Sequence, residues 1–353
     1  MFVRSVSFGA ALAAVVLLPL ACGSFNADAP PIDGSGEGGN GEAGTGTATE
    51  AGLGEGGPAS EGSTPAGPVV LAQGYKDLRA ITATETDVFF IDQAGGGGVF
   101  ALPLIGGNAR MLSVGGAPSS IAVDGNYVFW TDPANQNVQR APIAGGTITK
   151  TPPFQPIGGF VPSIIVAAGD AVVTLTGSTG NSGVIQQFGL DLGTTTAAAS
   201  GLTNPFSLAA NGSLLYWTEG GAGYVASGQV GMTSRTPRFQ EGDPEAIAAD
   251  AAGVYWTIPS AGKIRGSIGG AAPITLASGE NQPRSIAADG TYVYWTTSNN
   301  ELRRSGHQEN GTSSLFASGF MPLTEMHVRA IAVTSTYVVW LTADGKVMRA
   351  SSH

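Results

Sequence analysis

The sequence is poor in the residue types that disulfides, metal centres and acid–base sites need. Its 353 residues include one cysteine and three histidines. A single cysteine allows no disulfide within the chain and no cluster of thiolate ligands. The histidines, His307, His327 and His353, have no ligand partner at metal spacing. We therefore expect neither a metal nor a cofactor.

Positive charge and catalytic motifs are scarce as well. The chain has 16 Lys and Arg against 26 Asp and Glu, and no basic stripe, which argues against nucleic acid as a partner. Patterns for a serine nucleophile on a sharp turn, a zinc-binding helix, a phosphate loop and a calcium loop are missing. The sequence thus argues against most enzyme classes, but it does not identify a ligand.

A helical apolar period is missing after residue 67, and a strand-like pattern repeats seven times instead. Each repeat has an aliphatic marker followed, nine positions later, by a second position that carries all five tryptophans of the chain. Successive aliphatic markers are 39 to 45 residues apart, the length of a four-stranded propeller blade. The seven pairs are Ile81/Phe90, Ile121/Trp130, Ile165/Thr174, Leu208/Trp217, Ile247/Trp256, Ile286/Trp295 and Ile331/Trp340.

Each repeat divides into short strands separated by turn residues. In the second repeat, "SIAVD" alternates, "DGN" is a tight-turn signal, and "YVFWT" is β-branched and aromatic. Residues 68–75 resemble the fourth strand of a repeat, and the last repeat has room for only three strands. We predict an all-β fold: a seven-bladed β-propeller of four-stranded antiparallel blades, closed by the N-terminal strand pairing into the last blade.

The segments "YVFWTD", "YWTE" and "VYWTT" resemble the YWTD-type β-propeller repeats of lipoprotein-receptor ectodomains and bacterial envelope proteins. The resemblance covers roughly residues 68–351, and it implies that the motif aromatics are structural. The acidic motif residue is kept as Asp92, Asp132 and Glu219. The receptor domains have six blades and this chain has seven repeats, so the receptors' ligand specificity is not carried across.

The N-terminus has the features of an export signal with a lipid attachment site. In residues 1–22, Arg4 precedes an apolar core too short for a bilayer, which needs about 20 helical residues. The segment ends in "PLAC", which resembles a bacterial lipobox, so Cys22 is the expected lipidated residue. Ser24 is not the Asp that retains some lipoproteins in the inner membrane, so we expect an outer-membrane lipoprotein. The alternative is a chance cysteine beside an ordinary cleavage site.

Residues 23–67 are rich in Gly, Ala, Ser and Thr, with seven acidic residues and no Lys or Arg. This composition cannot bury a core, so we expect a disordered acidic linker that carries the propeller, residues 68–353, away from the membrane. The folded part is expected to be a single domain and a monomer. Asp124, Asp250 and Asp289 recur at one turn of the repeat, where we expect them to cap turn amides rather than bind a metal.

The best candidate binding residues stand two positions before the aliphatic markers, where each chain segment enters its innermost strand. Arg79, Glu245, Arg284 and Arg329 occupy this position in four repeats, so three arginines would cluster at one mouth of the central channel. Converging guanidinium groups suit a carboxylate, a phosphate or a sulfated sugar. The alternative is that they are solvated, or paired with Glu245 and Glu325.

These observations favour a binding scaffold for a protein, peptide or glycan, displayed at the bacterial cell envelope, either in the periplasm or on the surface. The first alternative is a small-molecule lyase or hydrolase with His327 and Glu325 near the channel mouth, since a histidine can transfer protons near neutral pH. The second alternative is a structural envelope spacer, which would have no ligand.

Overall fold

The computed structural model describes residues 67–153, 164–176, 182–193, 195–233, 235–319 and 330–353. These residues all belong to one compact unit of the chain, residues 61–353. The described part is all-β, with 28 strands and two three-residue 3-10 helices. No helix among these residues is long and apolar enough to cross a membrane.

The strands form seven four-stranded sheets, each of which is one blade, and in six of them the four strands follow one another in the chain. Blade one contains β2 (Leu78–Ala83), β3 (Asp87–Asp92), β4 (Gly98–Pro103) and β5 (Arg110–Val114), with the helix η1 (Ala94–Gly96) after β3. Blade two contains β6 (Ser120–Val123), β7 (Tyr127–Asp132), β8 (Asn137–Pro142) and β9 (Thr149–Lys150). Blade three contains β10 (Ile164–Ala168), β11 (Ala171–Thr176), β12 (Gly183–Gly189) and β13 (Thr195–Leu202). Blade four contains β14 (Pro205–Asn211), β15 (Leu214–Glu219), β16 (Tyr224–Gln229) and β17 (Thr236–Gln240).

The remaining three blades complete the ring. Blade five contains β18 (Ile247–Ala249), β19 (Gly253–Ile258), β20 (Lys263–Ile268) and β21 (Ile274–Ser278), with the helix η2 (Pro259–Ala261) after β19. Blade six contains β22 (Ile286–Ala288), β23 (Tyr292–Thr297), β24 (Glu301–Gly306) and β25 (Ser314–Ser318). Blade seven contains β26 (Ile331–Val333), β27 (Tyr337–Leu341), β28 (Lys346–Ser351) and β1 (Val69–Gln73).

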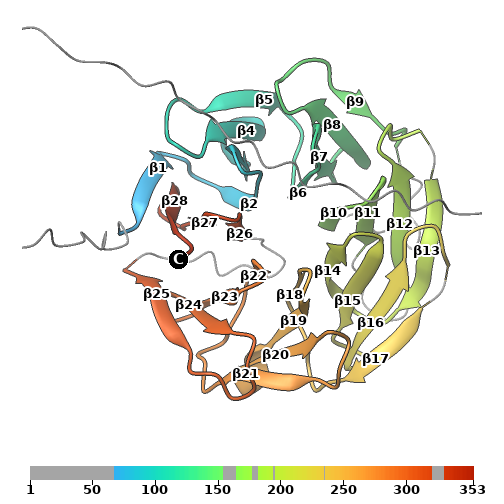
Figure 1. Ribbon diagram of the computed structural model, residues 1–353. Helices are drawn as coiled ribbons and strands as arrows, with labels where there is room; N and C mark the ends of the chain where they lie inside the picture. Colours follow the sequence, from blue (N-terminus) through green and yellow to red (C-terminus); the bar gives the residue numbers. More distant parts are fainter. Residues whose placement is uncertain (1–66, 154–163, 177–181, 194, 234, 320–329) are drawn as a thin grey trace, which may run out of the picture. The chain divides into compact units, whose positions relative to one another are not determined.

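The seven blades surround a common centre, with the first strand of each blade innermost (Figure 1). Every pairing within a blade is antiparallel, and β1 pairs with β28, so the predicted closure of the ring by the N-terminal strand is confirmed. Closure matters because without β1 the edge of β28 would be unpaired, and an unpaired strand edge invites association with other chains.

The repeat found in the sequence is the register of the first two strands of each blade. Ile121 is the cross-strand partner of Trp130, and Ile286 that of Trp295. All seven marker pairs are partners in this way, including Ile165 and Thr174. The third repeat therefore forms a full four-stranded blade, although it lacks the aromatic residue.

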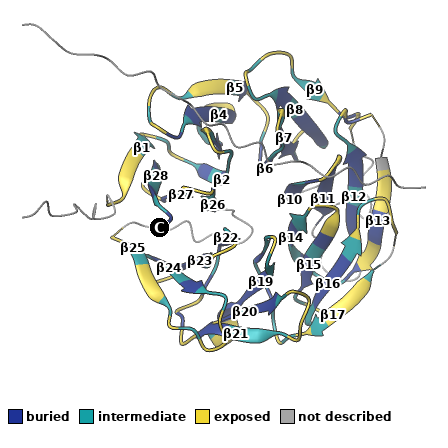
Figure 2. Ribbon diagram, in the orientation of Figure 1, coloured by how far each residue is buried: buried dark blue, intermediate teal, exposed yellow. Residues whose placement is uncertain are grey.

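The hydrophobic core is divided among the interfaces between blades. The buried apolar residues of the described part fall into seven clusters, and each cluster combines residues of two neighbouring blades. The five tryptophans are at most 1% exposed, and each packs in the cluster shared with the preceding blade. Figure 2 shows buried strands inside each blade and largely exposed outer strands such as β1, β5 and β25. The tryptophans thus join the blades to one another.

Blade three obtains its interface aromatic from a different strand. Thr174 is fully buried on β11, and Phe188 on β12 lies in the cluster between blades two and three. Phe188 pairs with Val172 and is 1% exposed. An aromatic ring therefore fills this interface too, from a position outside the repeat register.

The recurring aspartates cap turns, as predicted. The carboxylate of Asp124 accepts hydrogen bonds from the backbone N–H groups of Asn126 and Tyr127, at 2.7 and 2.6 Å. Asp250 and Asp289 make the same pair of bonds in blades five and six. These side chains satisfy the amides of the tight turn between the first two strands.

The role of the tryptophans can be tested at Trp295. Replacing it with Ala should lower the free energy of unfolding by about 3–5 kcal/mol, since a large buried side chain is lost at a blade interface. Urea denaturation followed by circular dichroism measures the change. Ile105 is 86% exposed, so Ile105→Ala should change stability by less than about 0.5 kcal/mol. Equal effects of the two substitutions would contradict this account of the core.

Candidate functional site

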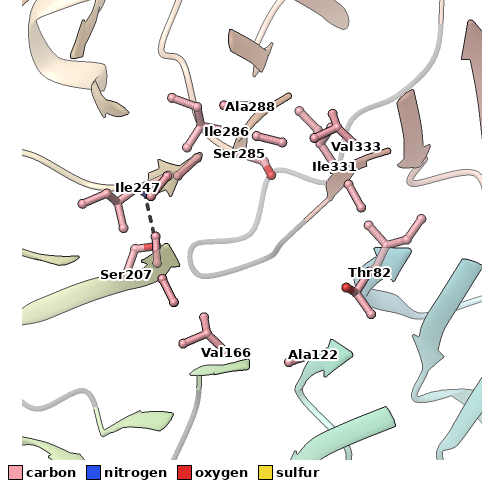
Figure 3. A pocket seen from close by; sticks show the side chains of 18 of the residues that line it. Thr82, Ala122, Val166, Ser207, Ile247, Ser285, Ile286, Ala288, Ile331 and Val333 are labelled. Carbon is pink, nitrogen blue, oxygen red and sulfur yellow. Dashed lines mark hydrogen bonds between the residues drawn. The ribbon is translucent and has the colours of Figure 1, made fainter. Parts of the chain in front are cut away.

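The central channel contains a cavity of about 290 Å³, and all seven blades contribute to its wall. Figure 3 shows the side chains that line this cavity, which come from the inner strands on all sides of it. Its size is near the lower end of the range typical of small-ligand sites. A site at this place can contact a ligand from every side.

The wall is made mainly of small apolar side chains. The first residue after each aliphatic marker lines the cavity, namely Thr82, Ala122, Val166, Ala209, Ala248, Ala287 and Ala332. The second residue after each marker does so as well, namely Ala83, Val123, Ala167, Ala210, Ala249, Ala288 and Val333. Alanine therefore predominates, and most of the wall lies close to the backbone of the inner strands.

Serine hydroxyls connect neighbouring inner strands at one end of this wall. Ser207 Oγ accepts a hydrogen bond from the N–H of Ile247 in the next blade, at 3.3 Å (Figure 3). Ser120 accepts from Ile165 at 3.2 Å, and Ser285 from Ala330 at 3.0 Å. These bonds link blades two to three, four to five and six to seven. They fix the spacing of the strands that form the wall.

The threonine of the motif holds the residues at the rim. The backbone N–H of Glu245 bonds to the carbonyl of Thr257, and the N–H of Ala246 bonds to its hydroxyl, at 3.0 and 3.1 Å. Thr296 holds Arg284 and Ser285 in the same way. In blades five and six, the tight entry into the inner strand is thus set by a buried threonine on the second strand.

An ion pair stands at the rim of the cavity. Arg284 Nη1 lies 3.1 Å from Glu245 Oε2, and both residues line the cavity together with Phe206. Both side chains are partly exposed, at 29% for Arg284 and 19% for Glu245. The described rim therefore combines an aromatic ring with a partly exposed, charge-balanced pair above an apolar interior.

The structure brings together two of the four predicted binding residues, Glu245 and Arg284. Arg79 is not among the residues that line the cavity, and its Nε lies 2.9 Å from Asp77 Oδ1. Arg329 and the alternative acid–base pair His327 and Glu325 lie outside the described residues, as does Cys22. The three-arginine cluster and the catalytic alternative therefore stay predictions.

A second group of titratable side chains lies at the opposite ends of the inner strands, around Asp250. Its carboxylate accepts bonds from the Tyr255 hydroxyl at 2.9 Å and from the N–H of Gly290 at 2.8 Å, and lies 3.8 Å from His307 Nε2. Burial raises the pKa of the Tyr255 phenol above its ordinary value, and the nearby Asp250 charge raises it further. These contacts join two turns of neighbouring blades, so their role is structural.

The acidic motif residues are structural as well. Asp132 accepts bonds from the backbone N–H groups of Ala117 and Asn135, each at 3.2 Å. Glu219 accepts from the indole N–H of Trp217 at 2.9 Å. Across the described part of the chain, no group of three or more His, Cys, Asp or Glu side chains is placed to hold a metal ion.

Sequence reasoning did not identify the alanine-rich wall. The signal was present, because the two positions after each aliphatic marker are small in most repeats. The sequence alone gave no reason to separate residues that fill a core from residues that border a cavity. Phe206 stands two positions before the marker Leu208, the same position that Arg284 has in its repeat.

No protein-family model matches the chain, and no curated protein sequence matches it. Solved structures match its fold. A streptogramin B lyase has a TM-score of 0.63 at 16% identity, over 80% of this chain and 97% of that chain. A structure described as YCF48 bound to D1 peptide has a TM-score of 0.61 at 12% identity, over 83% and 97%. The WD40 β-propeller domain of Doa1 has 0.61 at 10% identity, over 82% and 98%. At these identities the likeness shows the propeller fold alone.

The serine contacts can be tested by amide hydrogen exchange. In Ser285→Ala the buried Ala330 N–H loses its acceptor, which should cost about 1 kcal/mol or more and speed its exchange at least about fivefold. Ser207→Ala should speed exchange of the Ile247 amide and leave that of Ala330 unchanged. The two variants thus serve as controls for each other. An unchanged Ala330 amide in Ser285→Ala would contradict the contact.

Proposed function

We propose that this protein is an exported lipoprotein of the YWTD-like propeller class that binds a protein or peptide ligand at the mouth of its central channel. Cys22 carries the lipid anchor, and residues 23–67 connect the anchor to the propeller. The propeller is displayed at the bacterial cell envelope, on the outer membrane. The observation that carries the binding role is the cavity bordered by all seven inner strands, with Phe206, Glu245 and Arg284 at its rim.

The character of the cavity supports binding rather than catalysis. The described side chains that line it are mostly small and apolar, and its described charged residues are paired with each other. One structure of the same fold is described as bound to a peptide, which supports a peptide ligand for this scaffold.

Binding at the rim can be tested by replacing Phe206 with the photo-crosslinking amino acid p-benzoylphenylalanine. Irradiation of cells that export the protein should give a cross-linked adduct, because Phe206 lines the mouth beside the ion pair. Denaturing gel electrophoresis and mass spectrometry detect the adduct. The same amino acid at Arg238, which is exposed on the outer strand β17, should give none. No adduct at either position would favour the structural-spacer alternative. Equal adducts at both positions would contradict binding at the rim.

The anchor can be tested separately with Cys22→Ala. The wild-type protein should partition with the membrane fraction and incorporate a labelled fatty acid, since several acyl chains give stable anchoring where one is marginal. The variant should lose the label. Cell fractionation and fluorography measure both properties. A variant that keeps the label and the membrane association would contradict lipidation at Cys22.

A further inference from the structure

The inner strands present backbone hydrogen-bonding groups to the channel. Each is the terminal strand of its sheet, so one of its edges has no partner strand within the blade. In an antiparallel pair, residues whose N–H and C=O groups point to the partner alternate with residues whose groups point away. In blade five, the carbonyl of Ala246 and the N–H of Asp250 bond to the second strand. The backbone groups of Ile247 and Ala249 therefore point away from the second strand. The N–H of Ile247 bonds to Ser207 Oγ of the neighbouring blade at 3.3 Å, which leaves the carbonyl of Ile247 and both backbone groups of Ala249 pointing toward the channel.

Blade six repeats this arrangement. The carbonyl of Ser285 and the N–H of Asp289 bond to the second strand, so the groups of Ile286 and Ala288 point toward the channel. Along each strand these groups recur every two residues, a spacing of about 6.6 Å. An extended peptide has the same spacing of donors and acceptors along its edge. Because Ala249 and Ala288 have small side chains, another backbone can approach them closely.

Arg284 retains donors for a ligand. A guanidinium has five N–H donors. Bonds to other described residues engage Nη1, with Glu245 at 3.1 Å, and Nη2, with Gln282 at a long 3.4 Å. Glu245 thus holds the side chain of Arg284 at the rim, and within the described part of the chain the other N–H groups of the guanidinium make no hydrogen bond. Such a group binds a carboxylate through two parallel hydrogen bonds.

We propose that the cavity binds the C-terminal end of an extended peptide, with the terminal carboxylate on Arg284 and the last residues along the inner strands. This inference rests on the proposed function and names the ligand class. From Glu245 to Ala249 an inner strand extends about 13 Å, which corresponds to about four extended residues. The narrow, alanine-rich wall selects small or aliphatic side chains, and the strand edges bond to the peptide backbone, as in other cases of strand addition.

Two other occupants fit less well. A free phosphate or sulfate ion would place more negative charge than a single carboxylate beside Glu245, which lies 3.1 Å from Arg284, and would make no use of the small apolar side chains. A fatty acid would bury the channel-facing N–H and C=O groups without partners, which costs free energy for each group. A peptide terminus satisfies the carboxylate site, the apolar wall and the strand edges together.

Fluorescence anisotropy of a fluorescein-labelled Gly-Gly-Ala-Val-Ala peptide tests the proposal on the purified protein. The free acid should bind, and its C-terminal amide should bind about tenfold or more weakly, because a charge-assisted pair is lost. Arg284→Gln should weaken binding of the free acid to the same degree and leave binding of the amide unchanged. Arg238→Gln, on the outer strand β17, is the matched control and should change neither.

Filling the cavity tests the place of binding. Ala288→Leu should weaken binding of the peptide at least tenfold. If that variant does not fold, Ala249→Leu on the neighbouring blade tests the same point. Thermal unfolding shows whether each variant is folded. A peptide ending in three phenylalanines should fail to compete. Equal binding of acid and amide, no binding of the acid, or displacement of the peptide by octanoate at similar concentration would each overturn the inference. An adduct at Phe206 in cells would still support the proposed function in any of these cases.

Discussion

The whole ring depends on one contact, an aromatic side chain packed against the preceding blade. A four-stranded sheet has two faces, and neither can stay in water when both are apolar, so each blade needs a neighbour on each side. The tryptophans of five repeats and Phe90 of the first lie in the clusters between blades. Because each of these aromatic side chains stands at the same position in its blade, successive blades are arranged about a common axis and the array can close.

Closure then determines what the centre can offer. Bringing seven strand edges around one axis leaves a space that small residues border and larger residues would fill. The serine bonds and the buried motif threonines hold these edges at a fixed spacing. The inner strands therefore form a preorganised frame, so ligand binding would cost little conformational entropy of these strands. The binding function that we propose for this centre depends on backbone and rim geometry.

The sequence predicted the architecture well because the fold is a repeated local pattern. The spacing of Ile121 and Trp130 is a cross-strand register, and a register needs no knowledge of distant contacts. Phe188 shows where this fails: it completes the interface that Thr174 leaves without an aromatic, but it lies outside the repeat register, so spacing could not find it. At the rim, the sequence named pairing with Glu245 only as one alternative for the arginines. The ion pair of Arg284 with Glu245 joins blades five and six, so it depends on how far each blade is rotated, which spacing does not give.

The pairing of β1 with β28 has a consequence for the order of assembly. The first strand of the propeller has its partner in the last strand of the chain, so it must wait, unpaired, while every other blade is being synthesised. Blade seven can form only after β28 has been synthesised. A protein cut before Lys346 would lose β28 and with it the partner of β1, so the ring would lose its seam.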